Sequence, residues 1–148
     1  MVDYQAALII GAAGMAVQKL RADTAALNLA SAGASRPPGS MPYRAARVVV
    51  QTSATPSFTD LMQAGHASGR LMLPRAAGTV TVDSTPRMMH EPGHPHADDR
   101  GFVAYANVDT LAETLIIMNA SRAYEANLAG MSATRAMAMK ALEIGGQR

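Results

Sequence analysis

Residues 107–144 read NVDTLAETLIIMNASRAYEANLAGMSATRAMAMKALEI, and this stretch decides the fold. It contains no proline and only one glycine, the two residues that most often break helix interiors, so it predicts one long helix. At about 1.5 Å per residue such a helix would exceed ~50 Å, which is longer than a lone domain of this size needs. We therefore expect surfaces outside the chain to cover part of it. An ordinary compact helical bundle is the alternative.

The ends of this helix carry their own signals. Its start is expected at Asn107, or at Thr110 with Glu113 in capping-box spacing. Its end is expected at Gly145 and Gly146, because glycine favours the left-handed backbone that stops a helix.

The apolar residues of this helix form two stripes with spacings of three and four residues. The first is Val108, Leu111, Leu115 and Met118, and the second is Tyr124, Leu128, Met131, Ala138 and Leu142. The stripes are out of phase near Ser121, and Arg135 falls within the second. A dry two-helix zipper is therefore not expected, and a polar partner from another chain is one way to satisfy Arg135.

The N-terminal segment predicts a second helix. One face carries Ile9, Ala13, Ala16, Leu20 and Leu27 at helical spacing, and Gly33 with Pro37 and Pro38 ends it. All eight prolines lie between residues 37 and 95, so the chain divides into helix, proline-rich middle and helix. The predicted fold class is mainly α with a small β-containing middle. Residues 1–34 and 107–148 would pair as a coiled-coil core domain, and residues 35–106 would form a small outer domain of strands and loops.

The middle region predicts short strands at 43–51, 70–73 and 79–82. Residues 52–68 and 84–100 are rich in Ser, Thr, Gly, Pro and His, and we expect them to be exposed loops or hinges.

Composition and charge limit the functional classes. The chain of 148 residues is 49% hydrophobic but only 4% aromatic, with no tryptophan, which argues against a base-stacking surface. The net charge is +2 and the basic residues are dispersed, so no nucleic-acid partner is expected. The absence of cysteine excludes disulfides but does not fix the compartment.

The uncharged run at residues 6–17 bears on targeting. It is shorter than the ~20 apolar residues of a membrane span. It also lacks a basic n-region, having Asp3 instead, so a cleavable signal peptide is not expected. A membrane-active helix at residues 4–20 is a further alternative, but its polar face carries few basic residues.

Several runs of residues resemble the flagellar basal-body rod protein C family, a proximal-rod subunit of the bacterial flagellum. They are Glu91, Pro92, Gly93, Pro95, Ala97, Asp98, Gly101, Phe102, Val103, Asn107, Val108 and Asp109, then ASRAYEANL at 120–128, then Asn28, Leu29 and Ala30, then PYRA at 42–45 and VVVQ at 48–51. Only about residues 52–86 are without support. Ser31 departs from the family, in which a second asparagine is common there, and this departure concerns only the turn after the N-terminal helix.

The resemblance implies a structural subunit without catalytic residues or cofactors. Both terminal helices would line the inner layer of a tube that carries motor torque from the membrane ring to the distal rod and hook. The subunit would be exported by the flagellar type III apparatus and would lie in the periplasm-spanning rod of the basal body. Implied partners are copies of itself, rod proteins of the B, F and G types, rod-base and membrane-ring proteins, and the export apparatus. Another axial rod or hook-junction protein is the alternative.

Sixteen residues on the two helices are expected to mediate helix packing and assembly. They are Ile9, Ala13, Ala16, Leu20, Leu27, Asn28, Leu111, Leu115, Met118, Arg122, Tyr124, Glu125, Leu128, Met131, Arg135 and Leu142. Leu20, Leu27, Leu115, Leu128 and Leu142 are the expected core positions. Arg122, Glu125 and Arg135 are candidates for polar contacts between helices, with a solvated helix face as the alternative.

A metal site is the main rival hypothesis. The candidate ligands are His90, His94, His96, Asp98 and Asp99, whose nitrogen and oxygen atoms suit zinc. A metal site needs rigid supports, however, and the prolines and glycine within this segment indicate a loop. No metal is therefore expected.

Overall fold

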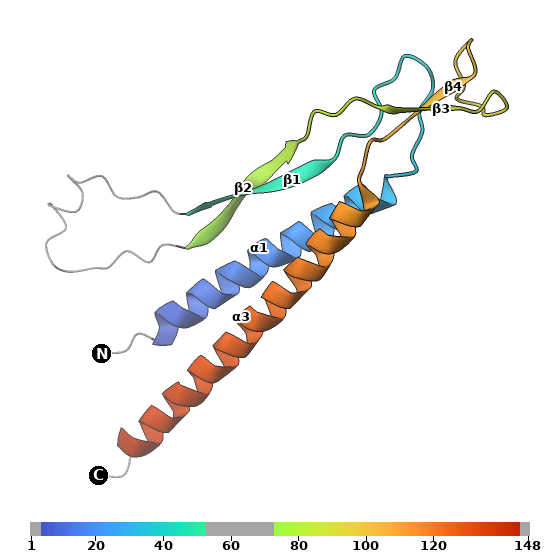
Figure 1. Cartoon of the computed structure of the whole chain (residues 1–148). Helices are drawn as coiled ribbons and strands as arrows, with labels where there is room; N and C mark the ends of the chain where they lie inside the picture. The colour runs from blue at the N-terminus through green and yellow to red at the C-terminus, as the bar shows by residue number, and fades with distance from the viewer. Residues whose placement is uncertain (1–3, 53–72, 146–148) are drawn as a thin grey trace, which may run out of the picture.

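The computed structural model describes residues 4–52 and 73–145, and two long helices dominate it (Figure 1). Helix α1 spans Tyr4–Ala30 and helix α3 spans Thr110–Gly145. The helices run antiparallel, because Asn28 near the end of α1 contacts Glu113 near the start of α3. The short strands lie between them in sequence. The predicted fold class, paired terminal helices with a small β-containing middle, is confirmed.

Helix α3 begins with a side-chain cap that the sequence assigned to the wrong residue. The Asp109 carboxylate accepts hydrogen bonds from the backbone N–H groups of Leu111 and Ala112, at 3.0 and 3.1 Å. Asp109 is therefore the N-cap, one residue before the Thr110 expected from the capping box. The Glu113 side chain does not reach back to the cap, because it takes part in tertiary contacts. The helix extends to Gly145, the last residue that the structure describes, so the predicted stop at Gly145 and Gly146 stays a prediction.

The segments that leave α1 and enter α3 lie beside one another. A turn follows α1, and Ser35 then forms an isolated antiparallel bridge with Tyr105. The backbone N–H of Ala106 donates to the Ala34 carbonyl at 3.4 Å. These contacts fix where the strand region joins the two helices.

The first pair of strands is an antiparallel hairpin of β1, Ala46–Thr52, and β2, Pro74–Thr81. The pairing shifts between Val49 and Val50, and Gly78 opposite Val49 has φ +145°, a backbone conformation that glycine adopts readily. The predicted strands at 43–51 and 79–82 overlap β1 and β2. The predicted strand at 70–73 and loop at 52–68 lie almost wholly outside the described residues.

The second pair, β3 at Arg87–His90 and β4 at Phe102–Tyr105, was not predicted. The interpretation of residues 84–100 as loop alone was wrong. The sequence of β3, RMMH, does not alternate between apolar and polar residues, and all four residues are exposed. Strand β3 exists because β4 supplies its hydrogen-bonding partners from beyond the intervening loop.

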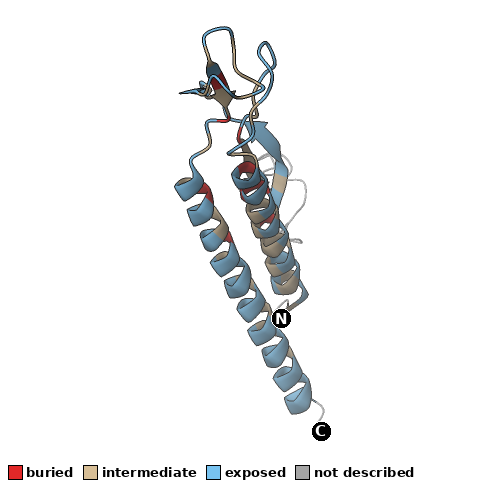
Figure 2. Cartoon of the chain, turned by 90° about the vertical axis from the view of Figure 1, so that its right-hand side faces the viewer, coloured by how far each residue is buried: buried red, intermediate tan, exposed pale blue. Residues whose placement is uncertain are grey.

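The buried core of the described residues is small and gathers where the helices meet the strands (Figure 2). Its apolar members are Val17, Ala25, Ala45, Val103, Ala106 and Ala120. Thr24, Asn28 and Glu113 are also buried. Within the described chain, neither helix has a stretch that is apolar enough to cross a membrane.

Candidate assembly surface

The two helices approach closely along a seam of small residues. A Cβ atom built on Gly11 would lie 2.6 Å from Cγ of Met131, and one built on Gly14 would lie 2.9 Å from Nδ2 of Asn127. Both distances are shorter than nonbonded atoms tolerate. The contact between α1 and α3 therefore depends on the absence of side chains at these two glycines.

This seam follows a different line from the predicted α1 stripe. Ala13 and Leu20 are half-buried, but Ile9, Ala16 and Leu27 are exposed. The positions of α1 that are buried are Val17, Thr24, Ala25 and Asn28. Of the predicted α1 residues, only Asn28 is fully buried within the chain itself.

The first predicted stripe of α3 faces away from α1. Leu111, Leu115 and Met118 are 69%, 50% and 46% exposed. At about 100° per residue, these positions lie on the side of α3 opposite the buried Glu113 and Ala120. The single chain thus leaves an apolar stripe uncovered near the start of α3.

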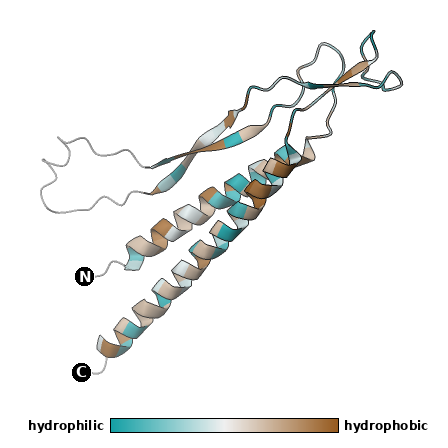
Figure 3. Cartoon of the chain, viewed as in Figure 1, coloured by the Kyte–Doolittle hydropathy of each residue, from teal (hydrophilic) through white to brown (hydrophobic). Residues whose placement is uncertain are grey.

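The second predicted stripe meets the seam at Met131. Met131 and Ala138 are half-buried, whereas Tyr124, Leu128 and Leu142 are exposed. Hydrophobic and hydrophilic segments follow one another along the ribbon of α3 (Figure 3). The two stripes therefore present apolar surface in two directions.

The three candidate residues for polar contacts between helices, Arg122, Glu125 and Arg135, are all exposed. No ion pair or hydrogen bond within residues 4–52 and 73–145 involves their side chains. Their role in contacts with other chains stays a prediction.

Asn28 lies at the centre of a set of polar contacts between α1, β1 and α3. Its Oδ1 accepts hydrogen bonds from the backbone N–H of Ala46 at 2.9 Å and from the hydroxyl of Tyr43 at 2.8 Å. Its Nδ2 donates to the Ala46 carbonyl at 2.9 Å and to Oε2 of Glu113 at 3.2 Å. The amide thereby uses all of its donors and acceptors.

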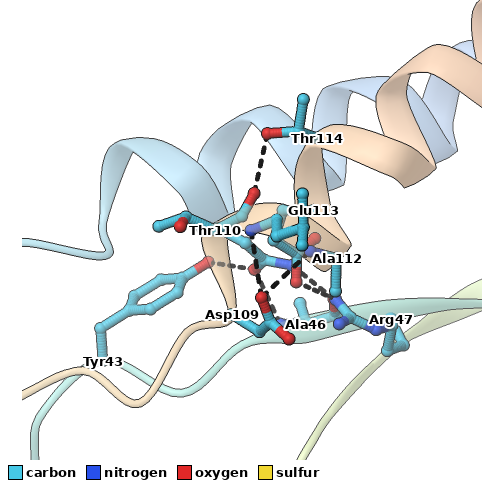
Figure 4. A network of polar contacts seen from close by, with 10 residues as sticks. Tyr43, Ala46, Arg47, Asp109, Thr110, Ala112, Glu113 and Thr114 are labelled. Carbon is cyan, nitrogen blue, oxygen red and sulfur yellow. Dashed lines mark hydrogen bonds and ion pairs between the residues drawn. The ribbon is translucent and has the colours of Figure 1, made fainter.

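Glu113 completes this set. We define the polar junction as Asn28, Arg47 and Glu113. Figure 4 labels Arg47 and Glu113 beside Tyr43 and Ala46. Oε1 of Glu113 lies 2.6 Å from a guanidinium nitrogen of Arg47. Glu113 is 0% exposed, whereas the side chain of Arg47 is 42% exposed. Sequence reasoning missed Arg47 and treated Glu113 as a cap, since neither residue belongs to an apolar stripe.

The histidine-containing loop between β3 and β4 is held by local contacts. Nδ1 of His94 accepts a hydrogen bond from the backbone N–H of His96 at 3.0 Å, and Nδ1 of His96 lies 3.0 Å from Oγ of Ser35. In the part of the chain that the structure describes, no three histidine, aspartate or glutamate side chains converge as a metal site requires.

Tyr105 on β4 is linked to the start of this loop. Its hydroxyl donates to Oε2 of Glu91 at 2.8 Å, and the Arg87 guanidinium lies 6.0 Å from its ring centre. The hydrogen bond to the Glu91 carboxylate raises the pKa of Tyr105 above its ordinary value, and desolvation and the negative charge of Glu91 act in the same direction.

The family model and the curated relatives that match this chain are all flagellar basal-body rod proteins. Residues 99–144 match the family described as flagellar basal body rod FlgEFG protein C-terminal. The flagellar basal-body rod protein FlgC of Salmonella typhimurium is 35% identical over 136 residues, which cover 92% of this chain and 93% of the relative. FlgC of Bacillus subtilis is 31% identical over 147 residues, which cover 93% of this chain and 95% of the relative.

Proposed function

Since the chain belongs to the flagellar basal-body rod protein C family, we propose that it is a structural subunit of the flagellar basal-body rod. The resemblance identified from the sequence is thereby confirmed. The family is structural, so the proposed role needs no catalytic residue or cofactor. The relatives carry the name of protein C, which favours this reading over another axial or hook-junction protein.

The observation that carries the proposed role is the uncovered apolar surface of α3. Leu115 and Leu128 lie on different sides of the helix and are 50% and 53% exposed. Large apolar side chains gain stability when partners remove them from water, and long helices depend on such packing. A subunit surrounded by neighbours on several sides would cover both stripes at once.

We assign these neighbours to copies of the chain and to rod proteins of the B, F and G types, with rod-base and membrane-ring proteins at the proximal end. In such a tube the close-packed helices would carry motor torque, because packed side chains resist compression. Torque would then be shared among many contacts along the 36 residues of α3.

We also assign export to the flagellar type III apparatus, without cleavage of a signal peptide, and a location in the periplasm-spanning rod. The small core supports this route, because the described residues bury few large side chains and so have little packing to lose on unfolding.

The substitution Leu128→Asp tests the proposed assembly. Leu128 is 53% exposed in the single chain, so the aspartate should leave the isolated subunit and its export intact. In an assembled wall the same carboxylate would be buried without a partner, which costs several kcal/mol. We expect cells that carry the variant to lack complete rods in purified basal bodies and to fail to swim.

The matched control is Leu128→Met, which keeps an apolar side chain of similar volume and should support normal rods. Complete rods and normal swimming with Leu128→Asp would show that Leu128 faces solvent in the assembly and would remove the support for this face. Loss of rods with both variants would point instead to a defect in the subunit itself.

A further inference from the structure

We propose that Asn28, Arg47 and Glu113 couple the docking of the β1–β2 hairpin to the pairing of α1 with α3, so that each depends on the other. The three side chains of this polar junction come from α1, β1 and α3. Each forms a contact with at least one of the other two elements. The polar junction would act as a positioning device that sets the hairpin against the helix pair.

Asn28 forms hydrogen bonds with two elements at once. Three of its four hydrogen bonds go to the chain at or just before β1, at Tyr43 and Ala46, and the fourth goes to Glu113 of α3. Asn28 is 0% exposed with the hairpin docked, so losing one partner while the hairpin stays in place leaves part of a buried amide unsatisfied. Undocking the hairpin would remove three of the four hydrogen bonds of Asn28 and leave only its bond to Glu113.

The polar junction also contains a buried charge. The carboxylate of Glu113 is buried on α3, and the cation beside it, Arg47, belongs to β1. A buried charge that loses its partner is strongly unfavourable, whereas Arg47, with 42% of its side chain exposed, could return to water at little cost. The ion pair is therefore asymmetric, and α3 depends on the hairpin more than the hairpin depends on α3 for its charge.

The hairpin depends on contacts with the helices for its position. A two-stranded hairpin alone is at best marginally stable in water. Strands β1 and β2 pack against α1, and the contact between Arg47 and Glu113 adds a link from β1 to α3. Each side chain of the polar junction lacks a hydrogen-bond or charge partner without the others, so their contacts form and break together.

A neighbouring ion pair provides the internal comparison. Arg44 and Asp83 lie 3.0 Å apart, and the side chain of Arg44 is 40% exposed, nearly the same as that of Arg47. Its partner Asp83, however, is 88% exposed. Exposed pairs contribute little, so loss of Arg44 should leave the helices unaffected.

The test uses amide hydrogen exchange of the full chain with four variants: Arg47→Met, Glu113→Gln, the double variant and Arg44→Met. The exchange is measured both on the purified chain and on the chain within isolated basal bodies. Arg47→Met should speed exchange of the β1 amides and of the α3 amides from Ile116 to Ala120 by about tenfold or more, because it leaves Glu113 unpaired.

Glu113→Gln removes the charge but keeps an acceptor for Asn28, so it should change exchange by less than about threefold. The double variant should resemble Glu113→Gln, because no buried charge is left without a cation. Rescue of Arg47→Met by the second substitution is the signature of the polar junction, and a merely local packing role for Arg47 would not produce it. Arg44→Met should match the unsubstituted chain.

Two results would overturn the proposal. One is a double variant whose exchange is faster than that of either single variant, with the effects simply multiplied. The other is an Arg47→Met variant in which exchange increases in β1 but not in α3. The coupling is a property of the chain, so these results do not bear on the rod function, which would instead fail if the chain were missing from basal bodies.

Discussion

The seam between α1 and α3 can be tested by adding one methyl group at Gly11. A Cβ atom at this position would lie 2.6 Å from Cγ and 3.1 Å from Sδ of Met131. Cγ is close to the helix backbone, so Met131 cannot simply swing its end away and must shift as a whole. The matched control is Gly130→Ala, since Gly130 is also helical and a Cβ atom there would meet nothing within 4 Å.

The two substitutions share one effect and differ in another. Alanine stabilises a helix interior by about 1 kcal/mol relative to glycine, and this gain applies to both positions. Overpacking costs about 1–3 kcal/mol and applies only at Gly11. We therefore expect Gly130→Ala to raise stability by about 1 kcal/mol. Gly11→Ala should be about 1–3 kcal/mol less stable than that control.

Thermal unfolding followed by helical circular dichroism measures the difference. For a chain of this length 1 kcal/mol corresponds to about 3 °C in Tm, so the two variants should differ by about 3–9 °C. Equal upward shifts of Tm in both variants would show that α1 and α3 do not approach closely at Gly11, and the description of the seam would be wrong.

Two further predictions concern the strand region. Glu91→Gln should lower the pKa of Tyr105 toward its ordinary value, seen by the ultraviolet absorbance of tyrosinate. Because the pKa of Tyr105 is raised, this contact stabilises the fold below the ordinary tyrosine pKa, and the stabilisation is lost as the pH rises through the raised value. An unchanged pKa of Tyr105 in Glu91→Gln would refute the contact. Replacement of His90, His94 and His96 by alanine should leave swimming intact. Stoichiometric zinc in the purified protein, together with loss of swimming in the triple variant, would instead establish a metal site.

The helices were predictable because their signals are local. The absence of proline, the spacing of apolar residues and the terminal Gly145 all lie within the helix or next to it. Strand β3 was not predictable in this way. Its four residues are exposed, and the partner that makes it a strand lies in β4, on the far side of a loop. Such pairing depends on tertiary structure, which the spacing of residues within β3 does not reveal.

The contact residues were harder to predict than the helices. Apolar spacing selected stripes such as Leu111 and Leu115, which the single chain exposes, so their predicted contacts with other chains stay a prediction. The seam instead uses Gly11, a residue that sequence reasoning treats as a helix breaker. The bond between Asn28 and Glu113 joins residues 85 positions apart, and no local pattern marks such a polar pair.

The antiparallel arrangement of the helices has a practical consequence for labelling. Helix α1 begins and α3 ends at the same end of the pair, and the loop between β3 and β4 lies at the other (Figure 1). Fluorescent proteins or affinity tags fused to either terminus would therefore crowd one end. Gly93 in the distant loop is exposed, and a side chain there would meet no neighbouring atom within 4 Å. A short epitope inserted at Gly93, imaged beside a terminal tag, would mark both ends of the subunit and give its polarity in electron micrographs.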